Sequence, residues 1–426
     1  MRFHFIAAVI EITFFCILLC FSSFSQERAN DFSNHIKALM IDGKNKTAIE
    51  ELRSILQKDS SNIEAYYLLG LNYEVLANYV NAAKALVMAV KNQPDNVRFL
   101  ESLGSNYYSS GLTNEAETVL YKAFLLDSAS NHIQILLGKV YMSEKKWSEA
   151  CNIYYRLISM DSTNSFFYQQ LAQCYSYLGK TIEAIKYDSV ANSLNPKNLN
   201  IILDLTYLFY IQDQFQEALN ILDDGLRYYQ HSANLWKWKG DVYIKNNDYD
   251  SALFSYQRSF YCGDSSGNIL KSMGICLYRT QKYSYAINYL EHSIELDPKD
   301  YTAFFYLGAS YKAQNKLDKA LENFEIADTL LENDFLSNVY LQMGSVYQIQ
   351  HKYNKALEYY KDAFRENPAD RSSIFYLAVM YDKLKNYGDA QDYYKMFLDY
   401  PDKMDIKLLD YAKQRISELK KQKIHK

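Results

Sequence analysis

The sequence has little glycine and proline and no excess of basic residues. Its 426 residues include 14 glycines and 5 prolines, roughly half and a quarter of ordinary usage, which argues against glycine-rich phosphate loops and all-β turn chemistry. Lys and Arg number 46 against 50 Asp and Glu, a net charge of −4, so nucleic acid is not an expected partner. With 49% hydrophobic and 23% charged residues, we expect a folded, helical chain.

The sequence also lacks the usual motifs of catalysis and metal binding. It contains no phosphate-binding loop, no His-Glu-x-x-His and no Gly-x-Ser-x-Gly. Its seven histidines are scattered without metal-ligand spacing. Ser143 and Lys146 match Ser-x-x-Lys, but they fall in a predicted turn without the companion motifs. We therefore predict no catalytic residue, no cofactor and no metal, and a protein that is not an enzyme.

Residues 1–25 differ from the rest of the chain. Arg2 precedes an apolar run over residues 12–21, and a small-x-small pattern follows, which predicts a secretory signal peptide cleaved before Gln26 and an exported, periplasmic or cell-surface protein. The run is shorter than the about 20 residues that span a bilayer. Cys20 leaves a second possibility open, a lipid anchor at the outer membrane. After residue 26 no apolar stretch approaches that length, so no integral membrane span is expected in the mature chain.

An internal repeat fills the rest of the chain. Alanine recurs in an unbroken column with steps of 34 residues and a single step of 36: Ala48, Ala82, Ala116, Ala150, Ala184, Ala218, Ala252, Ala286, Ala320, Ala356 and Ala390. Glycine forms a second column: Gly70, Gly104, Gly138, Gly240, Gly274, Gly308 and Gly344, with Ala172 and Thr206 at the two skipped places. Such periodicity predicts an array of identical supersecondary units.

One period reads as two amphipathic helices. Within residues 63–96, apolar residues recur at helical spacing around Gly70 and again around Ala82. We expect Gly or Ala of the first helix to face Ala of the second, so that the two backbones approach closely. Asp, Ser and Asn close most units, which suits N-caps, and glycines such as Gly111 fall at the turn between the two helices.

These positions resemble a known repeat family. Tyr66, Leu69, Gly70, Tyr73, Ala82, Leu86, Ala89 and Pro94 resemble the tetratricopeptide repeat signature, and Trp236, Lys239, Gly240, Tyr243 and Ala252 resemble its tryptophan-bearing form. The resemblance implies an all-α fold, a right-handed superhelical solenoid of helix-turn-helix repeats. A column of tyrosines is predicted to fill the core between helices: Tyr73, Tyr107, Tyr141, Tyr175, Tyr243, Tyr311, Tyr347 and Tyr381.

The predicted organisation has three parts. Residues 1–25 form the signal peptide, and residues 405–426 form a C-terminal capping helix with an apolar stripe. Between them lie eleven repeats over residues 29–404: 29–62, 63–96, 97–130, 131–164, 165–198, 199–232, 233–266, 267–300, 301–336, 337–370 and 371–404.

The resemblance implies that the first helices line a concave groove. Residues on the side of these helices away from the Gly and Tyr columns are the candidate peptide-binding residues: Tyr67, Glu101, Tyr108, Tyr207, Tyr210, Lys237, Trp238, Lys245, Lys271, Tyr278, Arg279, Phe305 and Lys312. The gathering of cations and aromatics in residues 233–336 favours an acidic, partly apolar peptide or protein partner. The predicted function is a non-enzymatic scaffold or adaptor. The alternative is a membrane-anchored cell-envelope assembly or secretion factor.

Four cysteines lie outside the signal segment. Cys151 with Cys174, and Cys262 with Cys276, each join a second helix to the first helix of the next repeat. Two disulfides are conceivable in an oxidising compartment, and buried free thiols that fill small spaces are the other reading.

Overall fold

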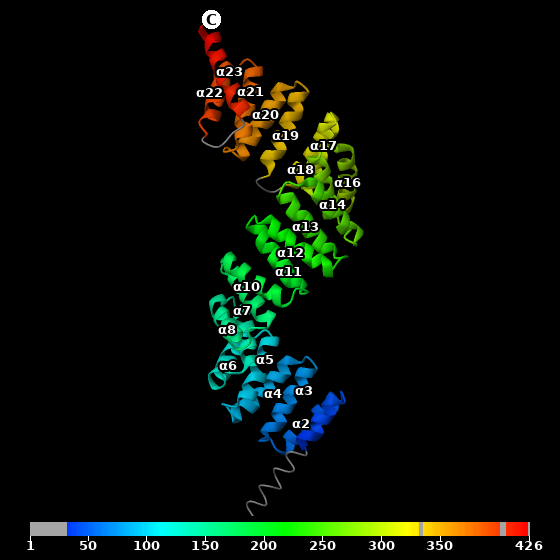
Figure 1. Cartoon of the computed structure of the whole chain (residues 1–426), viewed down its shortest axis with the longest axis vertical. Coiled ribbons are helices and arrows are strands. Elements are labelled where there is room, and N and C mark those ends of the chain that lie inside the picture. The colour runs from blue at the N-terminus through cyan, green and yellow to red at the C-terminus, as the bar shows by residue number, and fades with distance from the viewer. Residues whose placement is uncertain (1–31, 332–334, 401–405, 425–426) are drawn as a thin grey trace, which may run out of the picture. The chain divides into compact units, whose positions relative to one another are not determined.

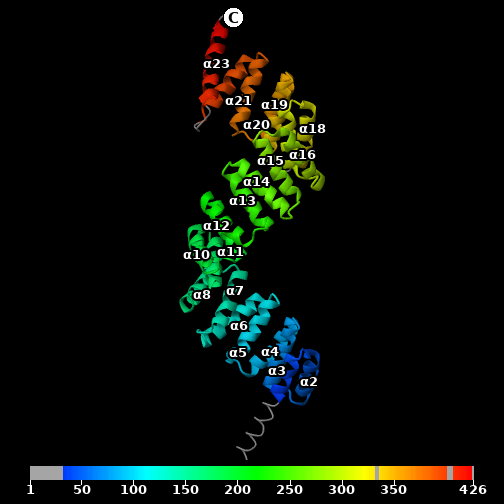
Figure 2. The same ribbon diagram turned by 45° about the vertical axis from the view of Figure 1, so that its right-hand side comes forward.

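The computed structural model describes residues 32–331, 335–400 and 406–424. These residues form helices and short turns, with no strand among them. The chain divides into two compact units, residues 1–208 and residues 209–426, which are described separately. Within each unit the helices follow one another in chain order (Figures 1 and 2). The all-α, helix-turn-helix repeat class predicted from the sequence is confirmed.

The first unit begins with helical residues 32–41. Its further helices are α2 (Asn45–Lys58), α3 (Ile63–Val75), α4 (Tyr79–Asn92), α5 (Val97–Ser109), α6 (Thr113–Leu126), α7 (Asn131–Ser143), α8 (Trp147–Met160), α9 (Ser165–Tyr177) and α10 (Thr181–Leu194). Helix α11 (Leu199–Ile211) contains the division between the units.

The second unit continues the same alternation. Its helices are α12 (Phe215–Tyr228), α13 (Ala233–Lys245), α14 (Tyr249–Tyr261), α15 (Gly267–Arg279), α16 (Tyr283–Leu296), α17 (Tyr301–Ala313), α18 (Leu317–Leu330), α19 (Leu336–Ile349), α20 (Tyr353–Glu366), α21 (Arg371–Lys383), α22 (Tyr387–Leu398) and α23 (Ile406–Ile424).

Helices pack mainly on their neighbours in sequence. Helix α3 packs on α4 and α4 on α5, and α15, α16 and α17 form the same chain of contacts. First helices of consecutive repeats are also in contact, for example α5 with α7 and α15 with α17. Each repeat therefore buries its apolar faces against the repeats beside it, which is the nearest-neighbour stabilisation typical of repeat arrays.

The glycine column marks the closest approach within each pair. A Cβ placed on Gly70 would lie 2.6 Å from Leu86 Cγ, and one on Gly240 would lie 2.6 Å from Tyr256 Cε1. The nearest atoms therefore belong to a large side chain four residues after the alanine of the column, rather than to that alanine. The carbonyl oxygen of Ala82 still lies 3.3 Å from the Gly70 position, so the backbones do approach closely.

Side-chain caps begin most first helices, as the closing residues of the units predict. Asn62 accepts a hydrogen bond from the Ala65 N–H at 2.9 Å, which satisfies one of the amides left without a partner in the first turn. The same role belongs to Asn96, Ser130, Asn164, Ser232, Asp300 and Asp370.

The predicted tyrosine column is buried at Tyr73, Tyr141, Tyr311 and Tyr347 and half-buried at its other four positions. Tyr73 and Tyr311 are 8% and 6% exposed. The Tyr311 hydroxyl donates to Glu291 at 2.6 Å, and the Tyr73 hydroxyl accepts from Arg53 at 2.5 Å. The structure also adds a column of fully buried aromatics on the second helices, Tyr154, Tyr256, Tyr360 and Tyr394, which the sequence analysis did not identify.

The C-terminal helix α23 packs its apolar stripe on the last repeat. Ala412 and Leu419 are buried in one core cluster with Tyr394 of α22. Arg415 forms an ion pair with Asp382 of α21. The eleven repeat boundaries and the assignment of a cap stay predictions. The signal peptide and the lipid anchor at Cys20 lie outside the described residues, and no described helix is long and apolar enough to cross a membrane.

The turn between paired helices has one left-handed residue in every repeat. Gly43, Gly111 and Gly179 have φ of 73°, 79° and 72°. The other eight turns hold non-glycine residues with φ between 53° and 63°: Ala77, Lys145, Asp213, Asn247, Gln281, Asn315, His351 and Lys385. A side chain with a Cβ is strained in this conformation, by about 1–2 kcal/mol per residue.

Ala77 and Gly111 provide a matched test of this strain, because both are exposed turn residues. We expect Ala77→Gly to raise the free energy of unfolding by up to about 1 kcal/mol through relief of left-handed strain. Gly111→Ala should lower it by a similar amount, since a Cβ there meets no atom within 4 Å and adds only backbone strain. Urea unfolding followed by circular dichroism measures both. A lower midpoint for Ala77→Gly would contradict this account.

Candidate functional site

Two lysines of the predicted binding segment are held by carboxylates of the chain itself. Lys237 pairs with Asp241 one turn along α13, with 2.7 Å between Nζ and Oδ2. Lys271 of α15 pairs with Asp300 at 2.5 Å, and the side chains are only 20% and 10% exposed. Asp300 also caps α17, so the Lys271 ion pair joins consecutive first helices. An acidic peptide would have to displace these carboxylates.

Lys312 of α17 is the most enclosed of the predicted cations. Its ammonium group donates to Gln342 and, at 3.4 Å, to the Ser345 hydroxyl of α19. Burial lowers the pKa of this ammonium group below its usual value. The group therefore links two first helices through neutral partners rather than presenting a charge at the surface.

Lys245 of α13 binds several groups near the start of the second unit. It pairs with Asp213 at 2.6 Å, donates to the Tyr210 carbonyl at 2.8 Å and lies 4.4 Å from the Tyr210 ring centroid. The Trp238 ring meets Tyr210 edge to face, with 5.9 Å between centroids. The structure thus brings three predicted residues, Lys245, Tyr210 and Trp238, within reach of one another.

Three further predicted residues are partly covered by neighbouring aromatics. Tyr278 of α15 meets Tyr306 edge to face. The guanidinium of Arg279 donates to the Tyr306 hydroxyl at 3.5 Å. Phe305 packs against the core of α17 and α18 and meets Phe335 at 5.0 Å. Of these, only Arg279 is exposed.

The predicted residues near the N-terminus do not form a common surface. Tyr67 is a correction, because it is 7% exposed and its ring is covered by Phe99 and Arg98 at 4.9 and 4.3 Å. It therefore belongs to the core. Glu101 bonds to His132 of the next first helix, and Tyr108 is half-buried beside the core of α7 and α8.

The structure reveals a site that the sequence analysis missed, around Asp188 of α10. Second helices place a large apolar or aromatic residue against the first-helix glycine, as Leu86, Leu120 and Tyr154 do. Asp188 occupies the same position of its repeat, 34 residues after Tyr154. It faces Ala172, which stands where most repeats have the first-helix glycine. It is 1% exposed. The signal in the sequence was a carboxylate in an otherwise apolar column.

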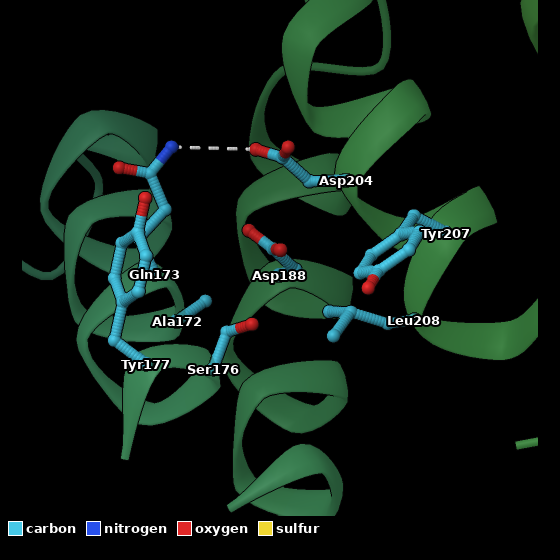
Figure 3. Close-up of a pocket in the computed structure, with 8 residues that line it drawn as sticks. All are labelled: Ala172, Gln173, Ser176, Tyr177, Asp188, Asp204, Tyr207 and Leu208. Atoms are coloured by element: carbon cyan, nitrogen blue, oxygen red, sulfur yellow. Dashed lines mark hydrogen bonds between the residues drawn. The ribbon is translucent and has the colours of Figure 1, made fainter. Parts of the chain in front are cut away.

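A cavity opens where the large side chain is replaced. It has a volume of about 430 Å³ and is lined by Ala172, Gln173, Ser176, Tyr177, Asp188, Asp204, Tyr207 and Leu208. These residues come from α9, α10 and α11 and all lie in the first unit. Figure 3 shows the carboxylates of Asp188 and Asp204 between the side chains of Tyr177 and Tyr207. Tyr207 is thus the one predicted site residue in this cavity.

The two carboxyl groups of the cavity have different surroundings. Asp204 accepts hydrogen bonds from the amides of Gln169 and Gln173 at 3.2 and 3.4 Å. Asp188 Oδ1 is buried without a hydrogen-bond partner among the described residues. Burial, and secondarily the charge of Asp204, raises the pKa of Asp188 to about 8. Asp188 is therefore largely protonated at neutral pH.

Aromatic residues form the mouth of the cavity. The Tyr177 ring stacks on Trp147 of α8, with 4.2 Å between centroids and 11° between planes, so its orientation is fixed by packing. Tyr177 and Tyr207 are 66% and 48% exposed. A group entering from solvent would pass these rings before it reached the carboxyl groups.

Among the described residues the cavity has no cluster of metal-ligating side chains. No group of three or more His, Cys, Asp or Glu side chains there could hold a metal ion. Cys151, Cys174, Cys262 and Cys276 are free thiols, and the thiols of Cys151 and Cys174 hydrogen-bond to each other. Cys151, Cys174 and Cys276 are buried, as the thiol reading of the sequence expects, and Cys262 is half-buried.

The described helices define a class of protein, an array of stacked helix-turn-helix repeats, whose members generally mediate protein–protein interaction. Residues 190–396 match the family model described as tetratricopeptide repeat. This stretch is therefore similar to that family, and the helix pairs before residue 190 have the same helix-turn-helix architecture.

Several known proteins are similar to the chain at low identity. It is 22% identical over 282 residues to the BBSome complex member BBS4 homolog of Drosophila melanogaster, covering 63% of this chain and 58% of that one. It is 22% identical over 397 residues to the TPR repeat-containing protein MJ1428 of Methanocaldococcus jannaschii, covering 86% and 69%. Yeast Tom70 superposes with a TM-score of 0.44 and 12% identity, covering 93% and 97%. The chain thus spans little more than half of the Drosophila relative.

The raised pKa of Asp188 predicts a pH-dependent stability. The folded protein binds the Asp188 proton more tightly than the unfolded chain, so this group stabilises the fold below about pH 4 and loses that effect as pH rises to about 8. The loss is at most about 1.4 kcal/mol per pH unit. We expect Asp188→Leu to remove this slope and to raise the urea midpoint at pH 8, because leucine is the usual residue of the column.

Urea unfolding from pH 4 to pH 9 measures the effect as the difference between the wild type and Asp188→Leu, so that titrations common to both cancel. Glu183→Gln, an exposed position on α10, is the control for loss of one carboxylate and should keep the wild-type slope. Parallel pH profiles for the wild type and Asp188→Leu would refute the assignment.

Proposed function

We propose that the protein is a non-enzymatic scaffold that binds partner proteins through its first helices. The observation that carries this proposal is the contact between consecutive first helices within each unit, α3 with α5, α5 with α7, α15 with α17 and α17 with α19, together with exposed tyrosines on first helices such as Tyr207 and Tyr376. The match of residues 190–396 to the tetratricopeptide repeat family supports it. The Drosophila relative is, by its name, a member of a complex. The partners expected for this protein are accordingly other subunits of a protein complex.

Polar contacts between consecutive first helices support this surface as a rigid one. Arg98 of α5 bonds to Glu64 of α3 at 3.0 Å, and Asn106 bonds to Glu74 at 2.8 Å. In the second unit, Lys271 and Lys312 link α15, α17 and α19 in the same way. A surface held in this manner loses little conformational entropy when a partner binds.

The acidic character of the partner stays a prediction. Lys237 and Lys271 are already paired within the chain, so their charge gives an acidic peptide little net gain. Attachment to the cell envelope through Cys20 likewise stays a prediction of the sequence.

Site-specific photo-crosslinking tests the scaffold proposal. Benzoylphenylalanine replaces an exposed tyrosine of a first helix, either Tyr207 (48% exposed) or Tyr376 (36%). In the comparison variants it replaces an exposed tyrosine of a second helix, either Tyr121 (47%) or Tyr285 (67%). Aromatic replaces aromatic, so folding should be retained. In cells that produce the full chain, we expect discrete adducts from the first-helix positions and none from the second-helix positions. Adducts from second helices alone would refute the proposal.

A further inference from the structure

We propose that the cavity at Asp188 is a subsite for a cationic side chain, arginine or lysine, of the partner protein. This inference rests on the proposed scaffold function and names the chemistry that one repeat recognises. Its basis is the combination of a cavity, a buried carboxyl group without a partner, a second carboxylate and an aromatic mouth in one place.

The buried Asp188 carboxyl group lacks the hydrogen bonds that such a group normally has. Its Oδ1 has no donor among the described residues, and the residue is 1% exposed. Burial of a polar group without a partner is costly, and in native proteins such a group usually signals a ligand, an ion or a functional role. The volume of about 430 Å³ lies within the range of ligand pockets, about 300–1,000 Å³.

The charge of the cavity selects a cation. Asp188 and Asp204 repel each other when both are ionised, and this repulsion contributes to the raised pKa of Asp188. No lysine or arginine of the described chain pairs with either carboxylate, whereas Asp241 and Asp300 each have a lysine partner within the protein. A bound cation would supply both the missing donor and the missing charge.

The aromatic mouth favours an organic cation over a metal ion. Tyr177, fixed by Trp147, and Tyr207 offer ring faces and edges to a guanidinium or ammonium group. A hard metal ion needs about six oxygen ligands, and the described residues provide no group of three acidic or histidine side chains. Arginine is the better match, because its planar group can donate to two carboxylates at once.

Peptide binding to the full chain tests the subsite directly. The probe is acetyl-Gly-Gly-Arg-Gly-Gly-amide, and its matched control carries neutral citrulline in place of arginine. We expect calorimetry at pH 8.5 to show saturable binding of the arginine peptide and at least tenfold weaker binding of the citrulline peptide. Asp188→Leu should bind the arginine peptide at least tenfold more weakly while remaining folded, and Glu183→Gln should bind it as the wild type does.

The pH dependence gives a second readout. The titratable groups facing Asp188 are Asp204 and Tyr207 from α11 and Tyr177 from α9. Because the cation binds the ionised carboxyl group, affinity for the arginine peptide should rise at least threefold from pH 6.5 to pH 8.5. The Asp188→Leu variant should lose that rise.

Several outcomes would overturn the subsite. The first is equal binding of the citrulline and arginine peptides, and the second is unchanged binding of the arginine peptide by Asp188→Leu. The third is tighter binding of calcium chloride or putrescine than of the arginine peptide, because that result would assign the cavity to a metal ion or a free organic cation. Photo-crosslinking separates this failure from failure of the scaffold proposal. Adducts at Tyr376 without peptide binding reject the subsite alone, whereas peptide binding without adducts at any first-helix position rejects the scaffold function alone.

Discussion

The contact between a first-helix glycine and a large side chain of the paired second helix sets the spacing of the helix pairs. In seven repeats a Cβ at the glycine would lie within 3.0 Å of Leu, Tyr or Phe atoms, closer than packed atoms allow. A larger residue would force the helices apart, at a cost of about 1–3 kcal/mol. Since each pair buries its remaining apolar faces on its neighbours, a fault in one contact weakens the repeats beside it.

The exception to this contact explains the candidate site. At Ala172 and Asp188 the large side chain is missing, so the same backbone arrangement leaves a cavity with a buried carboxyl group at its base. The neighbouring pairs keep their spacing through intact contacts such as that of Gly138 with Tyr154. The array can therefore hold one repeat in which this contact is missing.

Much of the fold could be predicted from the sequence, because close contacts demand small residues and small residues recur visibly in the glycine and alanine columns. The left-handed turn residue could be predicted only where it is a glycine, such as Gly111. Ala77 and Lys145 adopt the same conformation, but their residue types do not indicate it. The Lys271–Asp300 ion pair joins residues in different repeats, and its formation depends on how first helices align. Asp188 carried a signal in its 34-residue register, but the cavity beside it depends on packing in three dimensions.

Hydrogen exchange of the Gly274→Leu variant tests nearest-neighbour stacking most directly. The added side chain collides with Leu290, whose Cγ lies 2.6 Å from the Cβ position of Gly274. The account predicts loss of amide protection in α15 and α16, a smaller loss in the adjacent α14 and α17, and unchanged protection in α3 and α21. A uniform loss of protection across all described helices, or no loss in α15 and α16, would contradict it.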